Sequence, residues 1–518
     1  MPQFKVRVKW GKQKFNDVDL STAEAPEVFK MQLFSLTGVA PDRQKVMIGG
    51  VVVQNDTWGK AEPKVKQNAT FLMMGSADEL PSAPVEKTKF IEDMTDEDAA
   101  AAMFVPCGLE NFGNTCYMNA TLQCLKVIPE LKDALTRFSS SDPSVVSGIP
   151  ASITGALKLL YRMMGKNQPD MPLLLFMKSL HEAMPHFAER DEKSGAFKQQ
   201  DAHECWSTVL SNLGAVLKFS KPQEDEATAQ LKFIDQYFGV EQQSVYQCIE
   251  SPDEPETTET EKNLQVSCFI AQDVRYIHTA LKKGLEGEIE KSSPGLGRNA
   301  LYKKTTRFSR LPAYLTVQFV RFFVGKAPNS EDIVSKKILK DVKFQMKLDM
   351  YDFCTPGLQD KMLPIRRKYK EVEDKKIALK AKAISEFKAG ELKAIDTSKA
   401  VAYQPYDFPE DPGCSNSGMY ELQAVLTHQG RSSSSGHYLA WVKHSGNVWL
   451  KLDDDKVYMV LEEDILKLSG GGDWHVAYIL LYGPQRLEKL AEDVPTAEDM
   501  VTDPPTADSS STNDAAAP

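Results

Sequence analysis

The stretch that decides the fold runs from Gly108 to Leu125 and reads GLENFGNTCYMNATLQCL. Its first half is polar and rich in glycine and asparagine, which favours a turn. Its second half continues with residues that suit a helix. Cys116 therefore falls at or near a predicted helix N-terminus, where unpaired N–H groups and the positive end of the dipole stabilise a thiolate. Because the thiolate is the form of cysteine that attacks a carbonyl, the pattern indicates a candidate nucleophile.

This stretch resembles the cysteine box of the ubiquitin-specific proteases, a papain-like family. The resemblance implies that Cys116 is the nucleophile and that Asn111, five residues earlier, donates a hydrogen bond to the oxyanion. An amide N–H group suits that role because it stabilises developing negative charge without acting as a competing acid. The alternative for Asn111 is a residue that only shapes the turn.

Eight histidines compete for the role of general base, because a thiol nucleophile needs a nearby imidazole that takes and returns a proton. His437 follows Gly436 and leads into the strand-like run 439–442, and this context resembles the histidine box of the family. We therefore predict His437 as the base. His428, which precedes a glycine and a serine-rich segment, is the alternative.

Three adjacent aspartates follow a predicted strand over residues 448–452. A third group is needed to fix the tautomer of the base, and the family pattern assigns that role to Asp453. Asp454 is predicted to help by positioning water or a backbone group. The alternative is an ordinary solvated turn.

A further box, residues 199–204 with the sequence QQDAHE, resembles the family segment between the cysteine and histidine boxes. The resemblance implies that Gln200 and Asp201 support the architecture and the ubiquitin contacts. It also implies that His203, which lies in this box, is not catalytic.

Residues 1–75 form a separate pattern, in which Phe4, Val6, Val8 and Trp10 alternate with charged residues as in a half-buried strand. The order of two strands, a helix starting near Pro26 and further strands resembles a ubiquitin-like β-grasp. After Met74 the chain lacks the di-glycine end that conjugation requires, so we predict a docking module. A purely stabilising domain is the alternative.

The remaining chain divides by composition. We predict a linker over 76–103, an α/β catalytic domain over 104–484, and a disordered acidic tail over 485–518. The expected fold class is α+β, and the resemblance implies a papain-like domain built of fingers, palm and thumb. Residues 361–393 read as a charged helix, either a solvated insertion or a surface for an acidic partner or calmodulin.

Composition limits the function classes. The chain is 42% hydrophobic and 26% charged with a net charge of -10, which argues against nucleic acid or an anionic membrane as the main partner. No signal or spanning segment is recognised, so we expect the cytoplasm, with the nucleus as the other compartment. The eight cysteines form no CxxC pair, so we expect free thiols, no structural zinc and no cofactor.

The resemblance as a whole implies a thiol-dependent deubiquitinase that acts at the C-terminal glycine of ubiquitin. A ubiquitin-like unit ahead of such a domain is similar to the proteasome-associated members of the family, which implies docking on the proteasome regulatory particle and trimming of ubiquitin from substrates there. The segment just before His437 is predicted to be a mobile loop that gates the cleft, namely Arg431, Ser432, Ser433, Ser434 and Ser435. The alternatives are a non-catalytic ubiquitin-binding regulator and a protease for another ubiquitin-like modifier.

Overall fold

The computed structural model describes residues 3–75, 106–140, 148–192, 195–219, 231–326, 333–388, 402–432, 435–472 and 474–489. The chain divides into two compact units, Met1–Met103 and Phe104–Pro518, which are treated separately below. The predicted linker 76–103 lies outside the described residues, and so do Ser433, Ser434 and the chain after Lys489. Among the described residues, no helix combines the length and the apolar character needed to cross a membrane.

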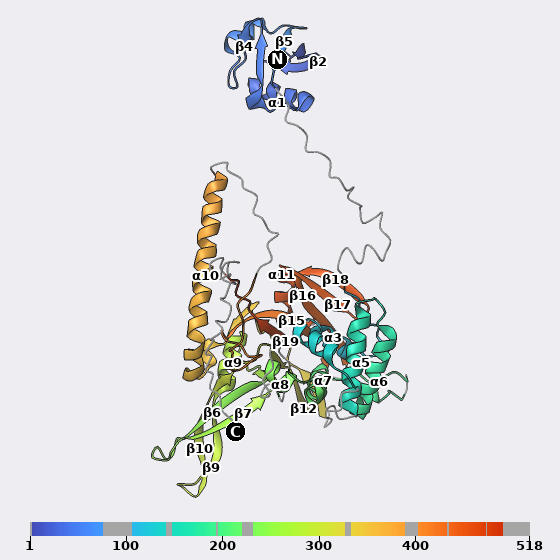
Figure 1. Cartoon of the computed structure of the whole chain (residues 1–518), viewed down its shortest axis with the longest axis vertical. Coiled ribbons are helices and arrows are strands. Elements are labelled where there is room, and N and C mark those ends of the chain that lie inside the picture. The colour runs from blue at the N-terminus through green and yellow to red at the C-terminus, as the bar shows by residue number, and fades with distance from the viewer. Residues whose placement is uncertain are drawn as a thin grey trace, which may run out of the picture. The chain divides into compact units, whose positions relative to one another are not determined.

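Within residues 3–75, the first unit places helix α1 on a five-stranded sheet with the strand order β2-β1-β5-β3-β4 (Figure 1). Its elements are β1 (Gln3–Trp10), β2 (Gln13–Ser21), α1 (Pro26–Thr37), β3 (Lys45–Ile48), β4 (Val51–Val52) and β5 (Thr70–Met74). The central pair β1 and β5 is parallel, whereas the other pairs are antiparallel. This is the predicted ubiquitin-like β-grasp.

The sequence pattern explains this unit directly. The alternating residues Val6 and Val8 are buried, as are Phe29 and Leu33 of α1. Helix α1 ends at Gly38, which has φ 71° and whose N–H group donates to the carbonyl of Phe34 at 2.8 Å. Glycine adopts this left-handed conformation without the steric cost that a Cβ atom brings, so it terminates the helix.

The second unit combines a helical lobe with an eight-stranded sheet and a separate four-stranded sheet (Figure 1). Its helices are α3 (Cys116–Leu125), α4 (Pro129–Arg137), α5 (Ile149–Met164), α6 (Asp170–Ala183), α7 (Ala202–Val216), α8 (Phe233–Phe238), α9 (Ile277–Leu285), α10 (Pro356–Lys388) and α11 (Glu462–Leu466). Its strands are β6 (Val240–Cys248), β7 (Thr257–Asn263), β8 (Val266–Phe269), β9 (Glu286–Ser293), β10 (Arg298–Arg310), β11 (Leu315–Val320), β12 (Phe322–Lys326), β13 (Ile333–Lys337), β14 (Lys347–Asp349), β15 (Met419–Ser432), β16 (Ser435–Ser445), β17 (Val448–Asp453), β18 (Lys456–Leu461) and β19 (Val476–Pro484).

The large sheet has the order β18-β17-β16-β15-β19-β11-β8, with β14 paired to β15, and its long strands are antiparallel. The four-stranded sheet β7-β6-β10-β9 projects from the body in Figure 1, and β12 and β13 pair as a separate hairpin. Two large apolar cores result, one that joins the helical lobe to the large sheet and one that includes α9, β8 and β11, and a small cluster lies between β6 and β10.

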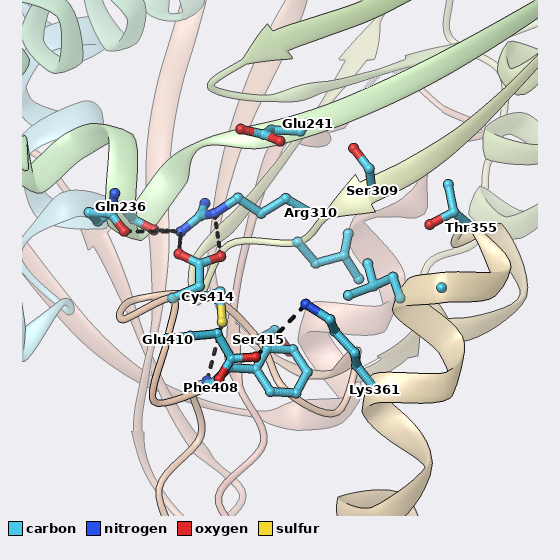
Figure 2. Close-up of a pocket in the computed structure, with 14 residues that line it drawn as sticks. Gln236, Glu241, Ser309, Arg310, Thr355, Lys361, Phe408, Glu410, Cys414 and Ser415 are labelled. Carbon is cyan, nitrogen blue, oxygen red and sulfur yellow. Dashed lines mark hydrogen bonds and ion pairs between the residues drawn. The ribbon is translucent and has the colours of Figure 1, made fainter. Parts of the chain in front are cut away.

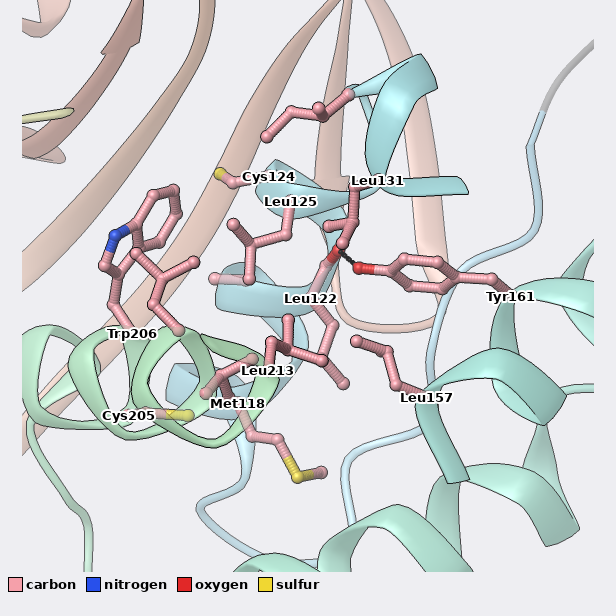
Figure 3. Packing of buried hydrophobic residues seen from close by; sticks show 14 of the residues in the cluster. Met118, Leu122, Cys124, Leu125, Leu131, Leu157, Tyr161, Cys205, Trp206 and Leu213 are labelled. Carbon is pink, nitrogen blue, oxygen red and sulfur yellow. Dashed lines mark hydrogen bonds between the residues drawn. The ribbon is translucent and has the colours of Figure 1, made fainter. Parts of the chain in front are cut away.

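Helix α3 lies at the centre of the helical lobe, and all ten of its residues are buried. Met118, Leu122 and Leu125 belong to the cluster in Figure 3, which also contains side chains from α5 and α7. The hydroxyl of Tyr161 donates to the carbonyl of Leu122 at 2.8 Å. Because truncation of one such buried leucine costs about 2–5 kcal/mol, this packing holds the first turn of α3 firmly in place.

The end of the catalytic unit departs from the predicted boundary. Residues 485–489 do not belong to a disordered tail, because Leu487 is buried and its carbonyl accepts the N–H of Gln404 at 2.8 Å. The predicted charged helix exists as α10, which begins at Pro356, earlier than predicted, and ends at Lys388. Its Pro364 lies inside the helix, so this proline does not break it.

Candidate active site

Cys116 is the first residue of α3 and is 2% exposed. The turn that leads to it is built by the side chain of Asn111, whose Oδ1 accepts the N–H groups of Gly113 at 2.9 Å and Thr115 at 3.1 Å. The predicted polar turn before a helix N-terminus is therefore present. Cys116 carries one of the backbone N–H groups that a helix leaves without an intrahelical partner.

His437 and Asp453 come from neighbouring strands of the large sheet. The β16–β17 register pairs Ala440 with Leu452, which brings both residues to the same end of the strand pair. The Nε2 atom of His437 lies 2.7 Å from Oδ1 of Asp453. Cys116 is the largest cause that raises the pKa of His437, which indicates that the thiol lies beside this ring. The imidazole thus lies near both Cys116 and the Asp453 carboxylate.

Electrostatics at this bridge favour a protonated imidazole. The neighbouring Cys116 thiol and then the hydrogen bond with Asp453 raise the pKa of His437 to about 9, against the opposing effect of burial. Burial acts to raise the pKa of Asp453, but the hydrogen bond and charge of His437 outweigh it, so this pKa is lowered. Lys451, 3.7 Å from Asp453, acts in the same direction. Asp453 therefore stays an anion beside a ring that readily carries a proton.

Asp454 joins the turn after β17 to the segment before α3. Its Oδ2 accepts from Nδ2 of Asn111 and its Oδ1 from Nδ2 of Asn119, both at 2.9 Å. Its carbonyl accepts the N–H of Leu109 at 2.8 Å. The approach is so close that a Cβ atom at Gly108 would lie 2.3 Å from the carbonyl oxygen of Asp455, so only glycine fits there. The predicted helper residue thus contacts the side chain of Asn111.

The box at 199–204 adds one residue to those that the prediction assigned a role. Gln199, which the sequence did not single out, donates through Nε2 to the carbonyl of Gly436 at 2.9 Å and lies 3.9 Å from the Cys116 sulfur. Gln200 instead donates to the carbonyl of His186. Asp201 accepts the N–H of His203 and the hydroxyl of Tyr478, so it caps α7. Two adjacent glutamines carry the same sequence signal, and only the path of the chain decides which one points at the nucleophile.

The alternative base, His428, lies on β15 and is not part of the His437–Asp453 pair. It is fully buried, and Lys337 donates to its carbonyl at 2.5 Å and lies 3.0 Å from its Nδ1. Burial and the Lys337 cation lower the pKa of His428 to about 3. A second neutral ring, His475, has its centroid 6.3 Å from that of His437, and burial together with the charge of His437 lowers its pKa to about 4.

The segment before His437 differs from the predicted mobile loop. Arg431 and Ser432 belong to β15, and Ser432 pairs with Ser435 of β16. The loop prediction is therefore wrong for these three residues, because the partner strand supplies backbone hydrogen bonds whatever the weak strand preference of serine. Ser433 and Ser434 lie outside the described residues. The register shifts between Gln429 and Ser432, so the tip of this hairpin is irregular.

The metal-ligating atoms of His437, Asp453 and Asp454 lie within 4.8 Å of one another. Within this cluster His437 is hydrogen-bonded to Asp453, and Asp454 accepts a hydrogen bond from Asn111.

A cavity of about 510 Å³ lies beside the start of α10 and is lined by none of the predicted catalytic residues (Figure 2). There the guanidinium of Arg310 pairs with both carboxylate oxygens of Asp411, at 2.8 and 3.0 Å, and donates to the carbonyl of Gly239 at 2.6 Å. These contacts join β10 to the segment before β15, which indicates a structural role.

The family model described as "Ubiquitin carboxyl-terminal hydrolase" matches residues 107–482. The chain is 39% identical to ubiquitin carboxyl-terminal hydrolase 7 of Arabidopsis thaliana, over 92% of this chain and 98% of that protein. It is 38% identical to ubiquitin carboxyl-terminal hydrolase 14 of Caenorhabditis elegans, over 94% of each. With a matched family domain and relatives of this similarity along most of its length, the chain belongs to the ubiquitin carboxyl-terminal hydrolases and is a thiol-dependent, cysteine-type deubiquitinating peptidase.

Proposed function

We propose that Cys116, His437 and Asp453 carry out the hydrolysis and that Asn111 stabilises the oxyanion. The observation that carries this proposal is the position of the His437 ring, which is hydrogen-bonded to Asp453 and lies beside Cys116, the largest cause of its raised pKa. Asp453 fixes the orientation of the ring through Nε2, which leaves Nδ1 for proton transfer to and from sulfur.

In the first half of the reaction, the Cys116 thiolate attacks the carbonyl carbon of the C-terminal glycine of ubiquitin. The oxyanion that forms accepts hydrogen bonds from the Cys116 N–H and from the amide of Asn111. The C–N bond then breaks while His437 donates its proton to the leaving amine, and a thioester remains on Cys116.

In the second half, His437 takes a proton from a water molecule, which attacks the thioester carbonyl. The C–S bond breaks, ubiquitin leaves with a free carboxylate, and Cys116 returns as a thiolate.

The direct test uses ubiquitin that carries an electrophile at its C-terminus. We expect one covalent adduct on Cys116, located by mass spectrometry, and no adduct with Cys116→Ala. The variant should bind ubiquitin and lose hydrolysis by several orders of magnitude. Cys107→Ala is the matched control, because Cys107 is the nearest preceding cysteine and lies before the turn. An adduct on another cysteine, or near-parental hydrolysis by Cys116→Ala, would reject the assignment. Competition with other free ubiquitin-like modifiers tests selectivity.

We further propose that the ubiquitin-like unit docks on the proteasome, where the enzyme trims ubiquitin from bound substrates in the cytoplasm or nucleus. One surface of the unit supports docking. Met47 of β3 pairs with Leu72 of β5 on one side and Val52 of β4 on the other, and the latter two are 39% and 45% exposed. These three neighbouring side chains form an apolar patch, which is a common feature of protein interaction sites.

The gating role of the Arg431–Ser435 hairpin also remains a proposal. The position of the hairpin supports this role, because the hairpin leads into His437. Gln199 donates to the carbonyl of Gly436 and lies close to Cys116. An extended ubiquitin tail has to enter beside these groups. A partner that prefers the open hairpin would raise the rate by shifting this population.

A further inference from the structure

Helix α10 carries a surface that the proposed chemistry does not use. The helix is 33 residues long, and in Figure 1 its C-terminal half extends past the sheets of the catalytic unit. Val372, near its middle, is 6% exposed, whereas Ile377, little more than one turn later, is 60% exposed. At 3.6 residues per turn these two side chains lie on different faces of α10, so Val372 packs against the body and Ile377 faces solvent.

The end of the described chain runs along this helix. Tyr369 donates to the carbonyl of Gln485. Seven residues later on the helix, the ammonium group of Lys376 lies 2.8 Å from the carboxylate of Glu488, which is three residues after Gln485. The helix from Tyr369 to Lys376 and the extended chain from Gln485 to Glu488 each advance about 10 Å. Residues 485–488 therefore follow α10 in the same direction, toward its C-terminal half.

The backbone fixes this course independently. The carbonyl of Leu487 accepts the N–H of Gln404, and the N–H of Lys489 donates to the carbonyl of Ala402, each at 2.8 Å. The chain after Lys489 thus starts beside the turn of α10 that contains Lys376. About six extended residues are enough to reach the end of the helix at Lys388, some 18 Å further on.

Charge on the two segments is complementary. Residues 375–388 contain five lysines and one acid, Glu386. Residues 490–518 contain seven acids and no lysine, arginine or histidine. The segment 389–401, which also leaves this end of the helix, has two lysines and two acids and therefore offers no net attraction.

The apolar pattern is complementary as well. The helical spacing of Tyr369, Val372 and Lys376 continues in the sequence at Leu379, Ala383 and Phe387. Acidic pairs alternate with apolar residues in 490–501, which reads LAEDVPTAEDMV.

We propose that the second half of α10, residues 376–388, is a docking surface for a mixed acidic and apolar segment, and that its occupant is residues 490–501 of the same chain. The interaction extends the contact that residues 485–489 already make with the helix. It is independent of the catalytic assignment, because it involves none of those residues.

The test measures hydrogen exchange of the backbone amides of residues 377–388. In the full chain we expect exchange at least about tenfold slower than in a chain that ends at Lys489, because docking suppresses fraying of the helix. The combined change Glu492→Lys, Asp493→Lys and Glu498→Lys should accelerate exchange to the rate of the shortened chain. About 0.5 M salt should remove most of the difference, since exposed charges are screened.

Two matched controls sharpen the result. The combined change Asp503→Lys, Asp508→Lys and Asp514→Lys alters the net charge equally but lies outside the proposed segment, so exchange should stay slow. On the helix, Lys380→Glu with Lys382→Glu should act like the shortened chain, whereas Lys303→Glu with Lys304→Glu on β10 should not.

Equal exchange in the full and shortened chains would overturn the proposal. An equal effect of the two tail variants would also overturn it, because general charge rather than this segment would then be responsible. Protection that survives shortening but disappears when 389–401 is replaced by glycine and serine would assign the surface to that segment instead.

Discussion

The Nδ2 atom of Asn111 donates to Oδ2 of Asp454 at 2.9 Å, across 343 positions of the chain. One N–H of this amide is thereby fixed, and the second is the one that would donate to the oxyanion in the proposed mechanism. Because Oδ1 of Asn111 also accepts two backbone N–H groups, the amide is held at both ends. Such preorganised donors stabilise developing charge without a reorganisation cost during the reaction.

The first prediction follows from this contact. Asn111→Ala should lower kcat for a ubiquitin C-terminal amide by roughly 10²–10³-fold, as expected for loss of one oxyanion donor. Asp454→Ala should cause a large part of this loss, because Asn111 is then no longer oriented. The double variant should be little worse than Asn111→Ala alone. If the loss of kcat in the double variant equals the product of the two single losses, Asp454 does not act through Asn111.

The second prediction separates the two candidate bases. His437→Ala should lose at least about 10³-fold in kcat/KM, because proton transfer to and from sulfur is lost. His428→Ala should keep most of its activity per folded molecule, although loss of a fully buried ring lowers stability. Titration with the ubiquitin electrophile supplies the active fraction in each preparation. Similar losses in both variants would contradict the choice of His437.

The third prediction concerns pH. Because the pKa of His437 is raised to about 9, the ring should keep the proton for the leaving amine through neutral pH and lose it above about pH 9. kcat/KM should therefore fall on the alkaline side near that value. In Asp453→Asn the negative charge that stabilises the imidazolium is gone, so the alkaline limb should move to lower pH. An unmoved limb would remove Asp453 as the partner of His437, and His444→Ala serves as a control outside the site.

The fourth prediction concerns the Arg431–Ser435 hairpin. A variant shortened within Ser432–Ser435 should have a higher basal rate and a smaller activation by proteasomes, because the free enzyme no longer has to open this hairpin. Shortening the β16–β17 turn at Gly446, in the next hairpin of the same sheet, should change neither quantity. If the shortened Ser432–Ser435 variant folds and behaves like the parent, the hairpin is not a gate.

The fifth prediction concerns the first unit. Removal of residues 1–75 should leave cleavage of a small ubiquitin amide unchanged, because the two units have separate cores. Co-sedimentation with proteasomes should drop sharply. Leu72→Asp should have the same effect, and Met31→Asp, at an apolar position on α1 that is 52% exposed, should have little. Undiminished co-sedimentation without residues 1–75 would locate the contact elsewhere.

The sequence by itself determined the elements whose causes are local. Alternation of Val6 and Val8 with charged residues predicts β1, Gly38 ends α1, and the polar turn before Cys116 predicts the start of α3. Hydrophobic periodicity and turn-forming residues act over a few neighbouring positions, so they can be recognised in a single sequence. The family boxes also singled out Cys116, His437 and Asp453, which the fold brings together.

Only the tertiary structure decided which side chains meet. The choice of Gln199 rather than Gln200 beside Cys116, the burial of His428 against Lys337, and the contact between Asn111 and Asp454 depend on where distant strands and helices pass. The same holds for Ser432 and Ser435, which a strand partner draws into a hairpin against their local preference. These contacts join elements that are far apart in the sequence, such as α3 with the large sheet and β13 with β15, and no local pattern encodes how such elements pack.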